Sequence, residues 1–248
     1  MIKKFFEYAV QADFEPIKSF HLKSDINRDI WNSDDNLKDE IREDLLKIAN
    51  DYLEYLEVDI KPDDIILTGS LANYNWSKYS DFDVHIVFDF TEIDKNIDLV
   101  QKYLDAKEKL WKEQHDINVN GFPIELYCQD ANAGVTATGI YSLVNEKWEK
   151  KPTKQNFVPD EDLIRTKGEK LMSSIDDLEK DFNNDIEYDE LMKKLKKVWK
   201  KIKDGRQAGL DREGEFSIEN LVFKLLRRNE YITKIMDIRR KAYDKQYK

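Results

Sequence analysis

The stretch from Thr68 to Phe90, TGSLANYNWSKYSDFDVHIVFDF, constrains the fold more than any other part of the chain. It places the pair Gly69-Ser70 directly after the apolar run Ile65–Leu67, and it places Asp81-Phe82-Asp83 directly before a second apolar run. Short apolar runs that are bounded by turn residues are typical of buried strands. The stretch therefore predicts a strand, a tight turn with a short helix, and a second strand that carries two carboxylates.

The two carboxylates suggest a metal site. Asp81 and Asp83 are two residues apart, so on a strand both side chains would point to the same face. Two carboxylates this close repel each other unless a cation neutralises them or one of them stays protonated. A hard cation such as Mg²⁺ prefers oxygen ligands and leaves room for substrate phosphates. Two such ions, about 3.5–4 Å apart, can bind the attacking and the leaving oxygen of a phosphoryl or nucleotidyl transfer.

The turn before these carboxylates suits a phosphate. Gly69 allows a sharp turn and a close approach of the backbone. Ser70 could cap a short helix and offer its hydroxyl and backbone N–H groups to a phosphate. A third carboxylate is expected on a neighbouring strand, where Glu125 is the first candidate and Asp130 the second. A Gly-Ser pair or an Asp-x-Asp alone is most often an ordinary turn or surface, but here the three features occur together.

Composition excludes several classes of protein. A single cysteine, Cys128, leaves no intrachain disulfide and no multi-cysteine zinc site in these 248 residues. This cysteine content fits a reducing cytosol. No apolar run approaches the roughly 20 residues that span a bilayer, so no membrane contact is expected. The net charge is −10, but residues 191–248 contain 18 basic and 8 acidic side chains, so this end carries +10 and the rest −20. A basic C-terminal end could face a polyanion, although solvated helix faces would look the same.

Hydrophobic periodicity gives the remaining elements and an α+β fold class. The expected fold is a short mixed β-sheet with helices on one side, followed by an α-helical C-terminal region. Two domains are expected, residues 1–150, which include an N-terminal helical extension, and residues 151–248. The expected elements are helices at 37–56, 91–114, 160–183, 189–204 and 218–243, a hairpin of strands 116–119 and 122–129 around Asn120-Gly121, and a charged connection at 205–214.

At these residues the chain resembles the nucleotidyltransferase superfamily typified by DNA polymerase β. The family pattern is a strand, Gly-Ser, a spacer, two acids that alternate with hydrophobic residues, and a third acid on a later strand. Here it is matched by Gly69-Ser70, Asp81-Phe82-Asp83-Val84 and Ile124-Glu125-Leu126. The third acid is often Asp in the family and is Glu here. Wider phrases, such as SFHLKSDINRDIW and GIYSLVNEKW, resemble predicted nucleotidyltransferases of tailed phages, which would place the protein in the host cytoplasm.

The resemblance implies roles for single residues. Asp81 and Asp83 would hold both ions, and Glu125 would hold the catalytic ion and help to activate the attacking hydroxyl. Gly69 and Ser70 would bind the triphosphate, with Ser80, His85, Arg227 and Arg228 as further candidates for nucleotide binding. His85 is as readily explained as a structural histidine, and the two arginines as part of a solvated helix face.

The implied reaction is transfer of a nucleoside monophosphate from a nucleoside triphosphate to an acceptor hydroxyl, with release of pyrophosphate. AMP is favoured as the transferred group, and two Mg²⁺ ions, or Mn²⁺ in their place, as the cofactor. The basic C-terminal helices favour RNA as the acceptor. A protein hydroxyl, a small molecule and a second nucleotide remain alternatives, as does a non-catalytic nucleotide-binding module that has kept the fold.

Overall fold

The computed structural model describes residues 13–134 and 136–247, which divide into two compact units. One unit is residues 22–156, and the other joins residues 13–21 to the C-terminal helices from residue 157 on. From the sequence, residues 13–21 are expected in the first domain. They group instead with the C-terminal helices because Ile17 and Phe20 are buried in the core of that unit.

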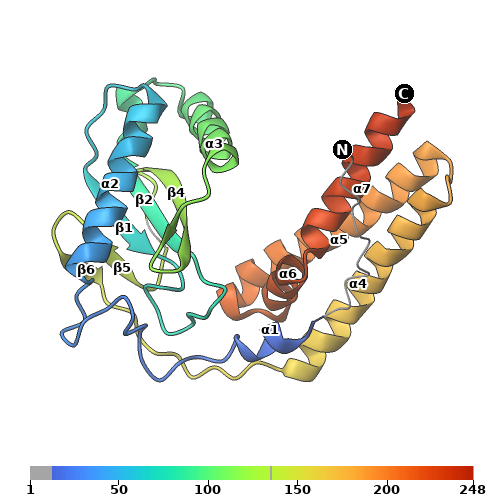
Figure 1. Cartoon of the computed structure of the whole chain (residues 1–248), viewed down its shortest axis with the longest axis horizontal. Helices are drawn as coiled ribbons and strands as arrows, with labels where there is room; N and C mark the ends of the chain where they lie inside the picture. Colours follow the sequence, from blue (N-terminus) through green and yellow to red (C-terminus); the bar gives the residue numbers. More distant parts are fainter. Residues whose placement is uncertain (1–12, 135, 248) are drawn as a thin grey trace, which may run out of the picture. The chain divides into compact units, whose positions relative to one another are not determined.

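A six-stranded sheet forms the centre of residues 22–156 (Figure 1). Its strand order is β3-β4-β2-β1-β5-β6, and only the pair β2–β4 is parallel. The mixed sheet confirms the expected fold class. The strand bounds are β1 Asp64–Thr68, β2 Phe82–Phe88, β3 Asn118–Val119, β4 Phe122–Asp130, β5 Ile140–Ser142 and β6 Lys147–Lys150.

The alternation of side chains along β2 explains why this sheet has one apolar and one polar face. Phe82, Val84, Ile86 and Phe88 are buried, whereas the residues between them are half-buried. The buried side chains share one core with residues of the helices α2 (Asp39–Leu56) and α3 (Ile97–Gln114). The two helices therefore cover the apolar face, and the polar residues of β2 lie on the other face.

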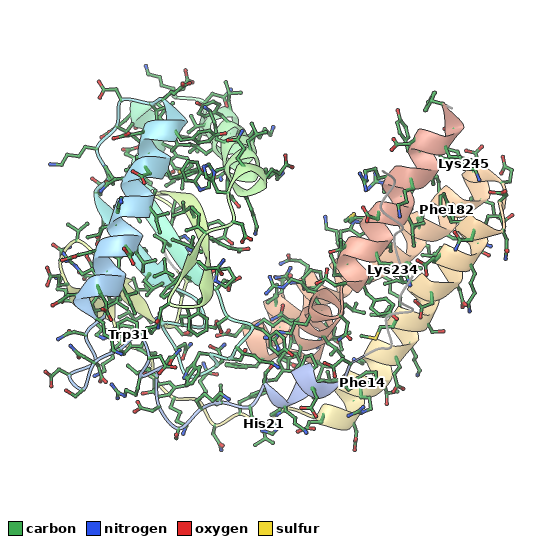
Figure 2. All side chains as sticks on the ribbon, in the orientation of Figure 1. Phe14, His21, Trp31, Phe182, Lys234 and Lys245 are labelled. Carbon is green, nitrogen blue, oxygen red and sulfur yellow. The ribbon has the colours of Figure 1, made fainter. Side chains whose placement is uncertain are left out.

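The hairpin that connects β3 to β4 forms as the sequence predicts. Asn120 and Gly121 have φ angles of 49° and 82°, which are the left-handed values that a tight two-residue hairpin turn requires. The strands β5 and β6 were not predicted. They are short, and Trp148 of β6 owes its position to stacking on Trp31, whose ring centroid is 4.5 Å away (Trp31 is labelled in Figure 2).

The second unit is a helical bundle with its own core. Its long helices are α4 (Glu161–Asn183), α5 (Tyr188–Glu213), α6 (Ile218–Arg228) and α7 (Tyr231–Gln246), and a short helix α1 (Glu15–Lys18) joins them. Phe182 of α4 and Lys245 of α7, labelled in Figure 2, meet with the ammonium 5.7 Å from the ring centroid. Among the described residues, none of the helices combines the length and the apolar composition that a membrane crossing requires.

Two predicted helix boundaries in this unit are wrong. The charged connection expected at residues 205–214 is the last part of α5, which runs without a break to Glu213. Gly205 and Gly209 suggested a loop, but Gly209 serves packing, because a Cβ atom there would lie only 2.7 Å from Ser217 Oγ. The expected long last helix is two helices, since the backbone reverses at Glu230, whose φ is 61°.

Candidate active site

Asp83 and Glu125 are brought together by the parallel pairing of β2 with β4. They are direct partners in the register of these strands, and both are half-buried. Residues paired in this way project from the same face of a sheet. The polar face of β2 and β4 therefore has two neighbouring carboxylates, as the sequence predicts.

Gly69 packs its backbone against one of these carboxylates. Its φ is +74°, a left-handed value that glycine adopts without strain. A Cβ atom at this position would lie 1.7 Å from Asp83 Oδ2 and 2.7 Å from Asp83 Cγ. Glycine is thus required at position 69 both for the turn after β1 and for the space that the Asp83 side chain occupies.

Residues 69–80 form a series of turns, so the short helix expected after Gly69 is absent. The Ser70 hydroxyl donates a hydrogen bond to Ser80 Oγ at 2.7 Å, and Ser80 Oγ also accepts one from the backbone N–H of Ser77 at 3.0 Å. Ser80 is buried. These contacts close the loop on itself and bring the end of the turn back to the start of β2.

Segments far away in the sequence hold this loop in place. The Trp31 indole N–H donates to the Leu71 carbonyl at 2.8 Å, and the Trp76 indole N–H donates to the Asp25 carbonyl at 2.9 Å. On another side, a Cβ atom at Gly139 would lie 2.0 Å from the Ala72 carbonyl oxygen. Sequence reasoning missed Trp31 and Gly139 as positioning residues, because neither is near the motif in the chain and only tertiary packing links them to it.

Glu125 has partners for both carboxylate oxygens. The ammonium of Lys112, on α3, bonds to Oε1, and the hydroxyl of Tyr127 donates to Oε2. The Lys112 side chain is 62% exposed and that of Glu125 is 20% exposed. Neither partner was predicted from the sequence. The Lys112 ammonium therefore places a positive charge beside the Glu125 carboxylate.

Tyr127 and His85 line the same face, two residues further along the two strands. Burial raises the pKa of Tyr127, and the neighbouring carboxylates of Glu125 and Asp83 raise it further, so the phenol keeps its proton. Burial lowers the pKa of His85, although a hydrogen bond to Gln129 opposes this shift. The two rings lie with their centroids 5.0 Å apart. A neutral His85 would meet a phosphate as a hydrogen-bond partner and not as a cation.

Asp81 immediately precedes the first residue of β2. That its side chain shares a face with Asp83 stays a prediction. Asp130, the second choice for the third acid, is on β4 an odd number of residues from Glu125. It therefore faces the other way and accepts hydrogen bonds from the backbone and side chain of Asn132. Within residues 13–134 and 136–247, no group of three His, Cys, Asp or Glu side chains is arranged to hold a metal ion.

The two predicted arginines lie at the end of α6 in the helical unit. Arg228 Nη1 donates to Ser19 Oγ at 2.5 Å and to the Pro16 carbonyl at 3.3 Å, and its guanidinium lies 4.7 Å from the centre of the Phe20 ring. These contacts give Arg228 a structural role in joining α1 to α6. Arg227 is exposed. A contact of either arginine with a nucleotide stays a prediction.

A glycine turn after a strand, two carboxylates paired across parallel strands and helices on the opposite face define a nucleotidyltransferase fold of the polymerase β type. A family model described as a nucleotidyltransferase domain matches residues 45–204. The chain therefore belongs to the nucleotidyltransferase domain family, which confirms the resemblance to that superfamily. The finer resemblance to phage proteins stays a prediction.

Curated proteins and solved structures give less information about this chain than the family model does. No curated protein matches the chain. Among solved structures, the chain is similar to one described as "Structure of STING-associated CdnE c-di-GMP synthase from Capnocytophaga granulosa". The similarity covers 84% of each chain at 10% identity, with a TM-score of 0.21. A TM-score this low carries no argument about the fold or the substrate.

Proposed function

We propose that this protein transfers a nucleoside monophosphate, with AMP favoured, from a nucleoside triphosphate to an acceptor hydroxyl and releases pyrophosphate. The proposal rests above all on the pairing of Asp83 with Glu125 on adjacent parallel strands, beside a glycine whose backbone packs against the Asp83 carboxylate. The chemistry of these donors fits a hard divalent cation, since carboxylate oxygens are the ligands that Mg²⁺ prefers.

Asp81, Asp83 and Glu125 would hold the ions, two Mg²⁺ or Mn²⁺ in their place. When bound, the ions neutralise the charge that develops on the phosphate oxygens and lower the pKa of the attacking hydroxyl. Tyr127 orients Glu125 through the hydrogen bond to Oε2. Gly69 leaves the space that the Asp83 side chain occupies, and the Ser70–Ser80 hydrogen bond fixes the turn whose backbone N–H groups would bind the phosphate.

A transfer assay tests the proposal directly. The protein is incubated with Mg²⁺ or Mn²⁺ and nucleoside triphosphates labelled at the α-phosphate. The label follows the transferred nucleoside monophosphate, and the released pyrophosphate is measured separately. An Asp83→Asn variant should lower the rate by roughly a hundredfold or more, since losing a metal ligand removes several kcal/mol of transition-state stabilisation. Asp44→Asn is the matched control, because Asp44 is exposed on α2 and should leave the rate unchanged.

The same assay separates the enzyme from a binding module that only kept the fold. If the wild type binds a nucleoside triphosphate but releases no more pyrophosphate than Asp83→Asn with every nucleotide and acceptor, the catalytic proposal is wrong. Removing the metal with a chelator should abolish turnover and leave the far-UV circular dichroism unchanged, because packed apolar side chains form the cores of both units.

RNA is the acceptor that we propose to test first, on the basis of the +10 charge of residues 191–248. Three other arms of the assay address the remaining acceptors. Label on the protein itself would indicate nucleotidylation of a side chain, a labelled product from nucleotides alone would indicate an oligonucleotide, and transfer to an added metabolite pool would indicate a small-molecule acceptor.

A further inference from the structure

The helical unit contains a cavity of about 290 Å³ between α4, α5 and α6. The proposed catalysis does not use it, and all of its lining residues belong to the helical unit. Its floor is made of apolar side chains, which are Leu171, Ile202, Val222, Phe223 and Leu226. A volume near 300 Å³ is at the small end of the range for ligand pockets, so a compact ligand would fill the cavity.

The rim of this cavity is cationic. Lys167, Lys170, Lys201 and Arg206 surround it, together with one carboxylate, Glu219. That carboxylate is already neutralised, because it accepts a hydrogen bond from Lys167 at 2.8 Å and another from Arg212 at 3.0 Å.

Two of the rim lysines have charges available for a ligand. Lys170 extends from α4 and Lys201 from α5, and neither ammonium forms an ion pair with any residue that the structure describes. Arg206 already has partners, since it donates to Asn220 Oδ1 at 3.1 Å and its guanidinium lies 4.1 Å from the centre of the Phe223 ring. Arg206 therefore holds one edge of the apolar floor in place.

We propose that this cavity binds a small amphiphilic anion, a medium-chain carboxylate, with its hydrocarbon body on the apolar floor and its carboxylate between Lys170 and Lys201. The floor has no polar side chain, so the hydrogen-bond donors and acceptors of a nucleobase would be buried there without partners. Burial of a hydrocarbon chain on the same floor is favourable. Two ammonium groups on facing helices suit the two oxygens of a carboxylate.

The charge of the rim also argues against the N-terminal segment of this chain as the occupant. Residues 1–12, MIKKFFEYAVQA, are apolar enough to cover a groove, but they carry two lysines and one glutamate. A segment with a net positive charge is repelled by a cationic rim. An anion is therefore the better complement to this cavity.

Titration of the full-length protein with sodium decanoate, below its micelle concentration, tests the proposal. Isothermal titration calorimetry gives the affinity, and methyl NMR locates the site through the Ile202, Val222 and Leu226 signals. A Lys170→Gln/Lys201→Gln variant should bind decanoate roughly tenfold more weakly, because two charge contacts are lost. The control variant Lys196→Gln/Lys203→Gln removes the same charge from exposed positions of α5 that do not line the cavity, and it should bind as the wild type does.

Further ligands decide between the alternatives. Decanol should bind more weakly than decanoate by a similar factor, since it lacks the charge, and sodium chloride at the same concentration should not shift the methyl signals. The proposal is overturned if decanoate leaves these signals unchanged, if AMP shifts them at lower concentration than decanoate does, or if decanoate binds only after residues 1–12 are deleted. Equal affinity of both double variants would also overturn it.

Discussion

Gly69 combines a backbone requirement with a requirement of the candidate active site. Replacement by alanine puts a side chain at a φ of +74° and into the space of the Asp83 carboxylate. We expect Gly69→Ala to lower the free energy of unfolding by about 1–2 kcal/mol for the backbone conformation and by about 1 kcal/mol or more for the overlap. It should also weaken Mn²⁺ binding, because Asp83 must turn away.

Gly121→Ala is the matched control for this change. Its φ is +82°, but a Cβ atom there would meet nothing within 4 Å. It should therefore show the cost of the backbone conformation alone and leave Mn²⁺ binding unaltered. Urea unfolding gives the stabilities, and electron paramagnetic resonance gives the Mn²⁺ affinities. Equal losses of stability in the two variants would show that the overlap with Asp83 is relieved without cost.

Lys112 would compete with a divalent cation for the Glu125 carboxylate. Because the Lys112 ammonium bonds to Glu125 Oε1, a metal ion must displace it before it can use that oxygen. We expect Lys112→Met to raise the Mn²⁺ affinity by a factor on the order of two to five, since an ion pair this exposed is worth about 0.2–1 kcal/mol. The affinity is read from the same resonance titration.

Lys109→Met provides the comparison for Lys112. Lys109 is exposed on the same helix and the change removes the same charge, but it forms no ion pair with any residue that the structure describes. Its Mn²⁺ affinity should match that of the wild type at moderate salt. If both variants gain affinity equally, the effect comes from the general charge of α3 and not from the contact with Glu125.

At the scale of elements, the sequence predicted the features that depend on residues close together in the chain. Three such features act within a few residues, and the structure contains each of them. They are the alternation of apolar residues in β2, the turn residues Asn120-Gly121 and the start of α4 at Asp160, whose carboxylate caps the helix. Glu125 was chosen as the third acid in the same way, because a polar residue stands out in an apolar strand, and the structure pairs it with Asp83.

Features that depend on packing across the chain could not be predicted in this way. Lys112 reaches Glu125 from a separate helix, and the short strands β5 and β6 gain their place from aromatic packing with Trp31. The uninterrupted helix α5 also depends on packing between residues that are distant in the chain. Its glycines resemble a loop in the sequence, and only the closeness of Ser217 to Gly209 explains why a helix has one there.

The two glycines of α5 should respond to alanine with opposite signs. At Gly205 the nearest atom to an added Cβ is Glu219 Cγ at 3.9 Å, an ordinary contact, so Gly205→Ala should stabilise the helical unit by up to about 1 kcal/mol. At Gly209 the Cβ would lie 2.7 Å from Ser217 Oγ and 3.0 Å from Glu219 Cβ. Gly209→Ala should therefore destabilise the unit by about 1–3 kcal/mol.

Urea unfolding followed by far-UV circular dichroism measures both changes. Helix propensity alone would make the two substitutions equally stabilising. A stabilised Gly209→Ala variant would therefore contradict the close approach of α5 to the start of α6.

At the scale of the whole molecule, the basic C-terminal charge is partly neutralised within the helices. Lys194 pairs with Asp181 and Glu190, and Lys200 pairs with Asp204. Lys193 and Lys197 are exposed, and within the described part of the chain neither forms an ion pair. The lysines of α5 are thus not equivalent as contacts for a polyanion.

If RNA is the acceptor, Lys193→Gln/Lys197→Gln should weaken RNA binding and reduce the slope of log affinity against log salt by roughly 0.7 for each lysine. Lys194→Gln/Lys200→Gln should have a smaller effect, since these charges already have partners. Fluorescence anisotropy with a labelled single strand, measured over a range of salt concentrations, checks both. Identical slopes for the wild type and the Lys193/Lys197 variant would exclude this surface as an RNA contact.

The clamping of residues 69–80 also has a consequence for synthesis on the ribosome. The loop is held on one side by Asp25 and Trp31, which precede it, and on the other by Thr138 and Gly139, which follow it. Contacts between distant residues form late, because the intervening chain must first be ordered. The nascent chain can therefore complete this loop only after the segment around Gly139 has left the exit tunnel, so a stalled or truncated product that ends earlier lacks a finished turn at residues 69–80.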